Sequence, residues 1–380
     1  PPVTQCRPMA RFRIAHLSDL HVAHVTANLR RLGRMLLPGE GGWWDVLARL
    51  AASSLERKSL FEPLTRSTHL AYKYDPRLLS AVLSDVRRSA ADYAVVTGDL
   101  SNLGATSELR EAVQTLAAFG FTRERCTIVP GNHDRINFSG TADWRRTLGA
   151  REYPHVDRAA EGIFVVAVDS TAHGDDLDWR DMVALNSRGR IGVDQIEKAD
   201  ALLAELPRDA MKILAVHHHL VDLPPDGYID DWADKLDPRL AAKAEGSEVL
   251  LDVAVARGVG LILFGHRHRP TRDDFLIRGI PAACSGAVAQ PDPSGVLKYR
   301  TFDFDGPRLV GRAWHSIEPS VALATCEKPV TAPDSGDDDL RATVAIDGGD
   351  LEGSLQKLRG KRRELERRAL EELAARARKK

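Results

Sequence analysis

The sequence has few cysteines, and the four that it has lie far apart. Cys6, Cys126, Cys284 and Cys326 form no CxxC pair, so neither a disulfide scaffold nor a zinc ribbon is predicted. No apolar run approaches the roughly 20 residues that a membrane-spanning helix needs. Residues 1–8 contain no apolar signal region. We therefore predict a protein without a transmembrane segment that keeps its thiols reduced in the cytoplasm.

The chain also lacks an excess of charge of either sign. Its 53 lysine and arginine residues and 54 aspartate and glutamate residues give a formal net charge of -1. The net charge of the chain therefore gives no support to a nucleic-acid partner, whose phosphates would need a basic surface. Because 43% of the 380 residues are hydrophobic, the chain can bury one large core or two ordinary ones.

Metal-binding side chains follow five short apolar runs that we predict to be strands. The runs span residues 12–17, 93–97, 126–130, 213–216 and 261–264. Aspartate, asparagine or histidine follows each run, and these residue types bind metals or move protons. The candidate site residues are Asp19, His21, Asp99, Asn102, Asn132, His133, Asp134, His217, His218, His219, His266 and His268.

Helical patterns lie between the predicted strands, over about residues 76–86, 106–119, 192–206 and 249–256. The first pattern begins with Asp75 and Pro76, which are typical of a helix N-terminus. A further strand is predicted over 164–168. Alternating strands and helices predict parallel pairing with right-handed crossovers.

Three shorter strands are predicted after residue 270, where the helical patterns end. They span residues 282–288, 297–304 and 308–314, with turn signals between the second and third at Asp305 and Gly306. We expect these strands to form a second, antiparallel sheet.

In chain order the polar clusters read D-x-H, G-D-x-x-N, G-N-H-D, H and G-H-x-H, and this set resembles the motifs of the calcineurin-like metallophosphoesterases. The resemblance covers roughly residues 11–315. It implies an α/β fold of four layers, in which two mixed β-sheets pack face to face between helices. It also implies two divalent ions, and ligands of oxygen and nitrogen without thiolate suit manganese, iron or zinc.

The family pattern implies a ligand role for seven of the candidates. Asp99 would bridge both ions, since a carboxylate has two oxygens to share. Two sets of three side chains would complete the coordination of the two ions. The first ion would be held by Asp19, His21 and His268. The second ion would be held by Asn132, His217 and His266.

The three consecutive histidines leave the register of the fourth motif to be decided. The family ligand is usually the first histidine after the strand, so we assign His217. His218 and His219 would then contact the ligands or the substrate.

The G-N-H-D motif implies a catalytic pair. By resemblance, His133 would lie near the substrate phosphate and help to protonate the leaving group, while Asp134 would orient its ring through a hydrogen bond. Asn102 would hold the turn after Asp99 or contact the substrate.

The resemblance implies hydrolysis of a phosphodiester by attack of a metal-bridging hydroxide. The compact motifs and the histidine-rich fourth motif resemble the bacterial cyclic-nucleotide phosphodiesterase branch, so a cyclic nucleotide is one candidate for the small phosphoester substrate. A phosphomonoester and a lipid-linked pyrophosphate are alternatives. A non-catalytic scaffold with the same fold is a further alternative, although it would predict lost ligands and this chain keeps them all.

The chain is predicted to contain one catalytic domain with flanking segments. The predicted segments are a tag remnant or extension at 1–8, the catalytic domain at 9–325, a linker at 326–350 and a basic amphipathic helix at 351–380. The terminal helix is interpreted as a solvated tail, or as a surface for docking or self-association.

A helical insertion interrupts the catalytic domain at residues 24–74. Its glycine-broken amphipathic pattern contains Trp43, Trp44 and several arginines. It is interpreted as a helical pair packed on the flank of the domain, as a cap over the site, or as a patch for a lipid or a partner.

Overall fold

The computed structural model describes residues 11–23, 75–102, 104–135, 140–149, 151–171, 189–222, 243–268, 270–289, 291 and 295–320, the side chains of 140–143 excepted. The predicted extension at 1–8, insertion at 24–74, linker at 326–350 and basic helix at 351–380 lie outside the described residues. The chain clusters into two compact units, Pro1–Pro329 and Val330–Lys380. All described residues belong to the first unit.

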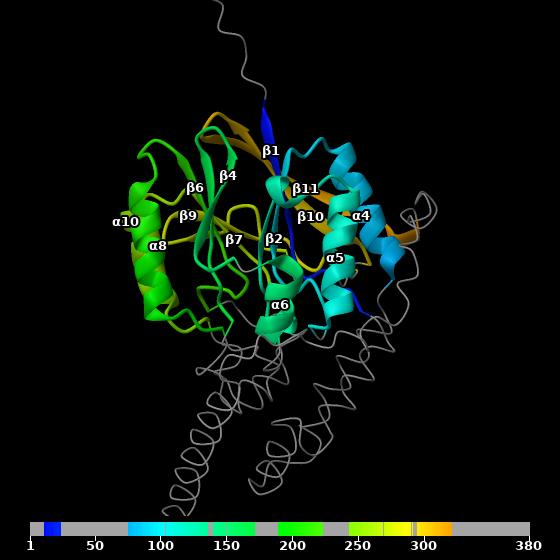
Figure 1. The fold of residues 1–380 in the computed structure, drawn as a ribbon. Helices are drawn as coiled ribbons and strands as arrows, with labels where there is room; N and C mark the ends of the chain where they lie inside the picture. Colours follow the sequence, from blue (N-terminus) through cyan, green and yellow to red (C-terminus); the bar gives the residue numbers. More distant parts are fainter. Residues whose placement is uncertain are drawn as a thin grey trace, which may run out of the picture. The chain divides into compact units, whose positions relative to one another are not determined.

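The first sheet has five strands in the order β11-β10-β1-β2-β3, of which β11, β10, β1 and β2 are labelled in Figure 1. These strands are β1 (Phe12–Leu17), β2 (Tyr93–Thr97), β3 (Cys126–Val129), β10 (Leu297–Asp305) and β11 (Arg308–Ile317). The strands β1, β2 and β3 run parallel, whereas β10 is antiparallel to both β1 and β11. The expectation that the strands after residue 270 form a separate sheet is therefore wrong for β10 and β11. They cover the free edge of β1, a long-range pairing that local patterns do not encode.

The second sheet has six strands in the order β4-β5-β6-β7-β9-β8. They are β4 (His155–Ala160), β5 (Ile163–Ala167), β6 (Met211–Ala215), β7 (Leu261–Phe264), β8 (Leu276–Ile277) and β9 (Ile280–Cys284). Strand β9, expected to be antiparallel over 282–288, pairs parallel with β7. The edge strands β4 and β8 pair antiparallel with their neighbours. The sequence did not predict them, because β4 is half-exposed and β8 has only two residues.

The predicted helices are confirmed as α4 (Pro76–Arg88), α5 (Thr106–Ala118), α8 (Val193–Glu205) and α10 (Ser247–Ala256). Asp75 caps α4 as expected, since its side chain accepts a hydrogen bond from the amide of Arg77 at 2.9 Å. Helix α6 (Gly140–Leu148) and the 3-10 turns η1 (Arg123–Arg125) and η2 (His133–Arg135) were not predicted. Within the described part of the chain, none of the helices has the length and apolar character needed to cross a membrane.

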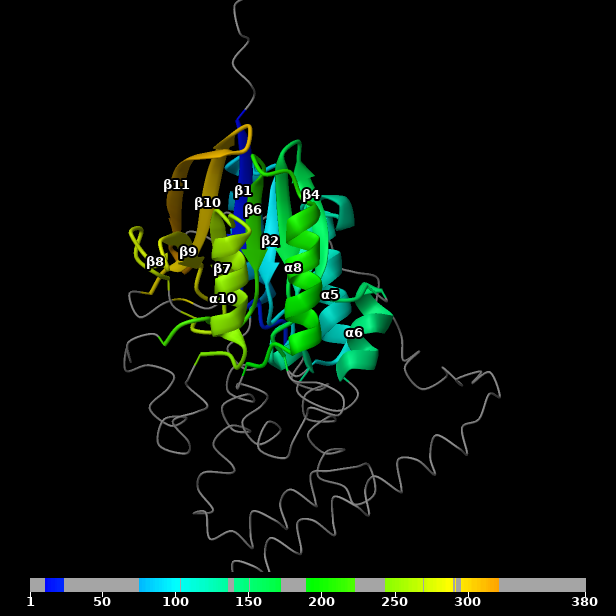
Figure 2. The same cartoon turned by 90° about the vertical axis from the view of Figure 1, so that its left-hand side faces the viewer.

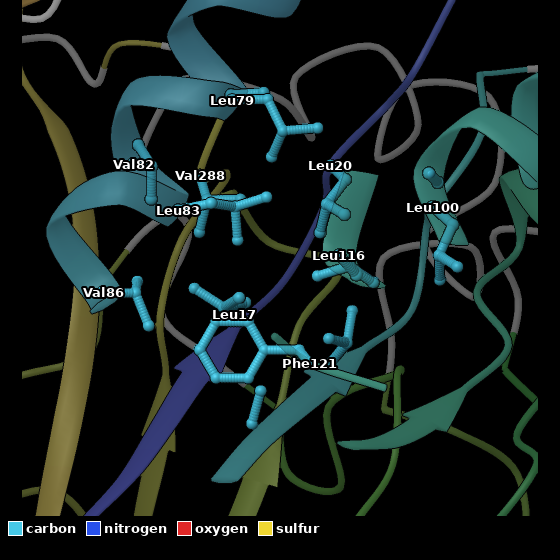
Figure 3. Close-up of a cluster of buried hydrophobic side chains, with 14 of the residues drawn as sticks. Leu17, Leu20, Leu79, Val82, Leu83, Val86, Leu100, Leu116, Phe121 and Val288 are labelled. Atoms are coloured by element: carbon cyan, nitrogen blue, oxygen red, sulfur yellow. The ribbon is translucent and has the colours of Figure 1, made fainter. Parts of the chain in front are cut away.

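Three buried clusters hold the layers together. One packs α4 and α5 on the first sheet through residues such as Leu17, Leu83 and Leu116 (Figure 3). A second packs α8 and α10 on the second sheet (Figure 2). The third lies between the sheets and joins Val95 to Ile213, so each apolar strand buries both faces. The expected four-layer fold of two mixed sheets between helices is confirmed.

Candidate metal centre

The loops after β1 and β2 are hydrogen-bonded to each other. The amide of Asp19 donates to the carbonyl of Gly98 at 3.0 Å, and the amide of His21 donates to the carbonyl of Asp99 at 2.9 Å. Because carboxyl ends of parallel strands meet at one edge of a sheet, this pairing places both loops side by side. The amide of His266, beyond β7 of the other sheet, donates to both carboxylate oxygens of Asp19 at 3.2 Å.

Backbone strain is concentrated at the candidate ligands. Of the seven described non-glycine residues with positive φ, five are candidate ligands. They are Asp19 (54°), His21 (46°), Asp99 (52°), His266 (72°) and His268 (54°). Each such conformation costs roughly 1–2 kcal/mol for a residue with a Cβ, and clustering of this kind is typical of functional sites.

The first ligand cluster contains Asp19, His21, Asp99 and His268, whose ligand atoms all lie within 4.8 Å of one another. His268 Nε2 lies 3.3 Å from Asp19 Oδ1 and 2.8 Å from His21 Nε2. Ligands that bind one ion at about 2.1 Å and at right angles lie about 3 Å apart. The spacing of this cluster therefore fits a single divalent ion.

The second ligand cluster contains Asn132, His217 and His266. Asn132 Oδ1 lies 2.9 Å from His217 Nε2 and 3.0 Å from His266 Nδ1. His217 Nδ1–H donates to the carbonyl of Thr97 at 2.7 Å, which leaves Nε2 as the atom with a lone pair for a metal. This tautomer and these spacings fit a second ion.

Asp99 lies between the two clusters. Its Oδ2 is 3.7 Å from His21 Nε2 in the first cluster and 3.5 Å from His217 Nε2 in the second. A carboxylate at this position can contact both ions of a dinuclear site. The histidine and aspartate cluster is thus suited to two metal ions.

Three glycines allow the loops to approach this closely. A Cβ on Gly131 would lie 2.1 Å from Asp99 Oδ1, and one on Gly98 would lie 2.4 Å from His217 Nδ1. A Cβ on Gly265 would lie 1.9 Å from Ser18 Oγ. Gly98 also has a φ of +91°. The glycine of each motif is therefore required by the packing of its neighbours.

The electrostatics of the site favour bound cations. Burial, together with the carboxylates of Asp19 and Asp134, raises the pKa of Asp99 well above its ordinary value. Burial would also raise the pKa of Asp19, but His268 and other histidines lower it below its ordinary value. Burial and neighbouring histidines lower the pKa of His266 well below its ordinary value. Neutral imidazoles beside crowded carboxylates are the state in which both can ligate metals.

The structure corrects the role expected for Asp134. His133 Nδ1–H donates to the backbone carbonyl of Asn102 at 2.7 Å, and not to Asp134. The Asp134 carboxylate instead accepts from the amides of Leu100, Ser101 and Gly131 and from the Ser101 hydroxyl. It holds the loops after β2 and β3 together. The Asp134 carboxylate is thus occupied by four donors from these loops.

The ring of His133 lies beside the first cluster. Its centroid is 4.7 Å from that of His21 in an edge-on arrangement. Burial lowers the pKa of His133 to about 4. Its fixed Nδ1–H leaves Nε2 as the atom that would exchange a proton.

The other histidines of the fourth motif are also buried at the second cluster. His218 can join His217 and His266 as a metal-binding group, with ligand atoms within 4.8 Å of one another. Its Nδ1 lies 2.8 Å from Ser170 Oγ. His219 stacks on His266 with ring centroids 5.8 Å apart. Asn102 contributes its carbonyl to His133, and its amide donates to Val22.

A sixth polar strand end was not predicted from the sequence. Asp169, Ser170 and Thr171 follow β5 and are buried. Asp169 forms an ion pair with the buried Arg135, which follows the G-N-H-D motif. The signal was present, because a polar cluster follows the strand predicted at 164–168, but it matches none of the five motifs.

Comparison with known families identifies the class of protein. Residues 12–270 match the family described as calcineurin-like phosphoesterase, which is more than half of the 380 residues. The chain belongs to this family. It is a metal-dependent phosphoesterase by fold, family and ligand set. None of the curated proteins matches the sequence.

Several solved structures resemble this chain at low sequence identity. A dimetal phosphatase from Danio rerio is 14% identical, with a TM-score of 0.47, and the match covers 80% of this chain and 98% of the phosphatase chain. Phosphopantetheinyl hydrolase from Mycobacterium tuberculosis is 15% identical, with a TM-score of 0.37, and the match covers 73% of this chain and 90% of the hydrolase chain. A purple acid phosphatase from yellow lupin is 14% identical, with a TM-score of 0.40, and the match covers 84% of this chain and 56% of the lupin chain.

Proposed function

We propose that this protein hydrolyses a phosphodiester at a site for two divalent metal ions. The observation that carries the proposal is the position of Asp99 Oδ2, 3.7 Å from a histidine nitrogen of the first cluster and 3.5 Å from one of the second. Two ions held there would supply Lewis acidity to the phosphoryl oxygens and a nucleophile near neutral pH.

The side chains around the clusters favour a diester over a monoester. A phosphomonoester carries a second negative charge near neutral pH, and positively charged groups beside the ions would help to bind it. Among the described residues, the hydrogen-bond partners of the candidate ligands are other ligands, hydroxyls and backbone groups. The buried Arg267 lies between His266 and His268 in sequence, and its charge contributes to the lowered pKa of His266. A diester with one charge per phosphate suits a site in which the ligands' hydrogen bonds come from other ligands, hydroxyls and backbone groups.

His133 is proposed to deliver a proton to the leaving oxygen. Its Nδ1–H is held by the carbonyl of Asn102, so the transferred proton must come from Nε2. The imidazolium form is disfavoured by burial, which lowers the pKa of His133 to about 4. A negatively charged phosphate next to the ring would raise that pKa again. The substrate phosphate would thus favour the protonated ring that the leaving oxygen needs.

The identities of the metals and of the substrate are also part of this proposal. Manganese, iron and zinc all suit a ligand set of carboxylate, carboxamide and imidazole. A cyclic nucleotide of the kind hydrolysed by the bacterial cyclic-nucleotide branch is the first substrate to try. The lipid-linked pyrophosphate alternative depended on the insertion at 24–74, which lies outside the described residues.

The test compares a diester with a monoester that has the same leaving group. Protein loaded with manganese is assayed on bis-p-nitrophenyl phosphate and on p-nitrophenyl phosphate, and we expect kcat/KM at least about tenfold higher on the diester. Asp99→Asn protein, purified in parallel, controls for contaminating activity. Faster hydrolysis of the monoester would refute the diester assignment, and no turnover of either ester with two bound ions would indicate a scaffold.

A further inference from the structure

A cavity lies between helices α5 and α6, which are side by side in Figures 1 and 2. Its volume is about 410 Å³, within the range of small-molecule sites. Several of its lining side chains are apolar and belong to the buried cluster that packs α5 on the first sheet, namely Leu116, Phe121, Cys126 and Trp144. The cavity therefore offers an apolar group a place out of water.

The charged side chains that line this cavity are all basic. They are Arg123, Arg146 and Arg151, and the described lining residues include neither aspartate nor glutamate. Arg151 forms an ion pair with Asp157, which lies outside the lining. The guanidinium of Arg123 has neither a hydrogen bond nor an ion pair with any described residue. One cation at the cavity is thus available to a ligand.

Neighbouring carboxylates leave this charge largely uncompensated. Glu124 follows Arg123 in sequence, but it is exposed and lies outside the lining. Its carboxylate accepts from the Thr122 hydroxyl at 2.7 Å. That hydrogen bond is the main cause of the lowered pKa of Glu124, and the charge of Arg123 is the least of the causes. Glu152, next to Arg151, also lies outside the lining.

The guanidinium of Arg123 lies near the end of α6. A Cβ built on Gly149, which follows that helix, would lie 3.5 Å from Arg123 Nη1. Helix C-termini carry partial negative charge, which would oppose an anion. Arg145 and Arg146 in the last turn of α6 offset that charge. At the end of α5, the amides of Phe119, Gly120 and Phe121 bond the last carbonyls.

A buried hydroxyl also lines the cavity. Thr147 Oγ1 is shielded from solvent and has no hydrogen-bond partner in the described part of the chain. A buried hydroxyl without a partner costs free energy, and a polar atom of a ligand would supply the missing partner. Guanidinium and hydroxyl are both donors that a carboxylate accepts from.

We propose that this cavity binds an amphipathic carboxylate, whose apolar chain lies between α5 and α6 and whose head group pairs with Arg123. An arginine fork matches both oxygens of a carboxylate, and the apolar lining stabilises the chain by removing it from water. None of the candidate metal ligands lines this cavity. The binding site is therefore separate from the metal centre and does not require the proposed phosphodiesterase function.

The test is isothermal titration calorimetry with three ligands of one chain length and different head groups, decanoate, 1-decanol and decylamine. We expect one site per chain and an affinity for decanoate about tenfold above that for decanol, because a charged hydrogen bond is added. Octanoate should bind about tenfold more weakly than decanoate, because it buries two fewer methylene groups. Equal affinity for decanoate and decylamine, or no binding of decanoate below its micellar concentration, would overturn the proposal.

Two variants locate the ligand. Arg123→Gln should weaken decanoate about tenfold and leave decanol unchanged, and its matched control is Arg110→Gln, an exposed position of α5 outside the lining. Ala117→Trp should fill the cavity and abolish binding of both ligands, whereas Ala118→Trp, at the exposed next position outside the lining, should not. Circular dichroism checks that each variant is folded. Wild-type affinity for decanoate in folded Ala117→Trp protein would place the ligand elsewhere and refute the assignment.

A last arm separates this cavity from the metal centre, since a carboxylate can also bind metal ions. Decanoate is titrated into metal-free protein, into protein loaded with manganese, and into loaded protein with bis-p-nitrophenyl phosphate. We expect the same dissociation constant in all three titrations, whether or not the ester is hydrolysed. Binding that requires manganese, or that the ester competes away, would assign decanoate to the metal ions and overturn the proposal.

Discussion

Gly131→Ala should disable the metal centre without changing any proposed ligand. The added Cβ would lie 2.1 Å from Asp99 Oδ1 and 2.3 Å from the Asp99 amide nitrogen, whereas ordinary contacts begin at 3.4 Å. One contact is with backbone, so a side-chain rotation cannot relieve both. The carboxylate or its loop must therefore move by about 1 Å, a displacement that can lower a rate by about 10²-fold.

The expected result is a loss of about 10²-fold in kcat/KM on bis-p-nitrophenyl phosphate, which equals about 2.7 kcal/mol of activation free energy. Metal content should fall as well, because Asp99 Oδ2 lies between both clusters. The measurements are steady-state kinetics with manganese, metal content by mass spectrometry and the melting temperature.

Gly311→Ala is the matched control. Its Cβ would meet Asp303 at 3.4 Å, an ordinary contact in the β10–β11 pair. We expect wild-type kinetics and metal content from it. If Gly131→Ala keeps two ions and activity within about twofold of wild type, the close approach of these two loops does not organise the site, and the reasoning fails.

Three further predictions concern the ligands and the proposed acid. Asp99→Asn should lose metal from both clusters and most activity; two ions per chain with near-normal turnover would exclude it as a bridge. His217→Ala should lower metal occupancy, whereas His219→Ala should change mainly the kinetics, and loss of metal in His218→Ala alone would shift the assigned register by one residue. His133→Ala should keep both ions and lower kcat/KM about 10²–10⁴-fold on alkyl diesters. The loss should be much smaller on nitrophenyl esters, because nitrophenolate leaves without a proton. An equal loss on both classes would indicate a positioning role.

The sequence predicted the parts of the fold that local patterns determine. Helix α4 was identified from its Asp75 cap and apolar stripe, and the strands before the metal motifs were identified from short apolar runs. The partner of β10 was not predictable in this way, because its pairing with β1 joins Phe12 to Phe304 across the whole domain. Pairing of this kind depends on which sheet edge is free once the rest has folded.

The candidate site was predicted in its residue types but not in its hydrogen bonds. Seven ligands were proposed from motif order, and the structure brings them into two clusters that meet at Asp99. The hydrogen-bond partner predicted for His133, the Asp134 carboxylate, was wrong, because a residue that is adjacent in sequence need not be adjacent in space. Asp134 turns back to the amides of its own and the neighbouring loop, and Asn102 supplies the acceptor through its backbone. Backbone partners of this kind have no signature in residue identity.

Side chains from both sheets make up each of the two clusters. Asp19, His21 and Asp99 come from the first sheet and meet His268 from the second, while Asn132 of the first meets His217 of the second. Each ion would therefore connect the two sheets, and its binding free energy would add to the stability of their packing. Without cations, buried carboxylates and left-handed backbone at five ligands oppose that packing. The apolar layer between the sheets offsets that cost through its own packing.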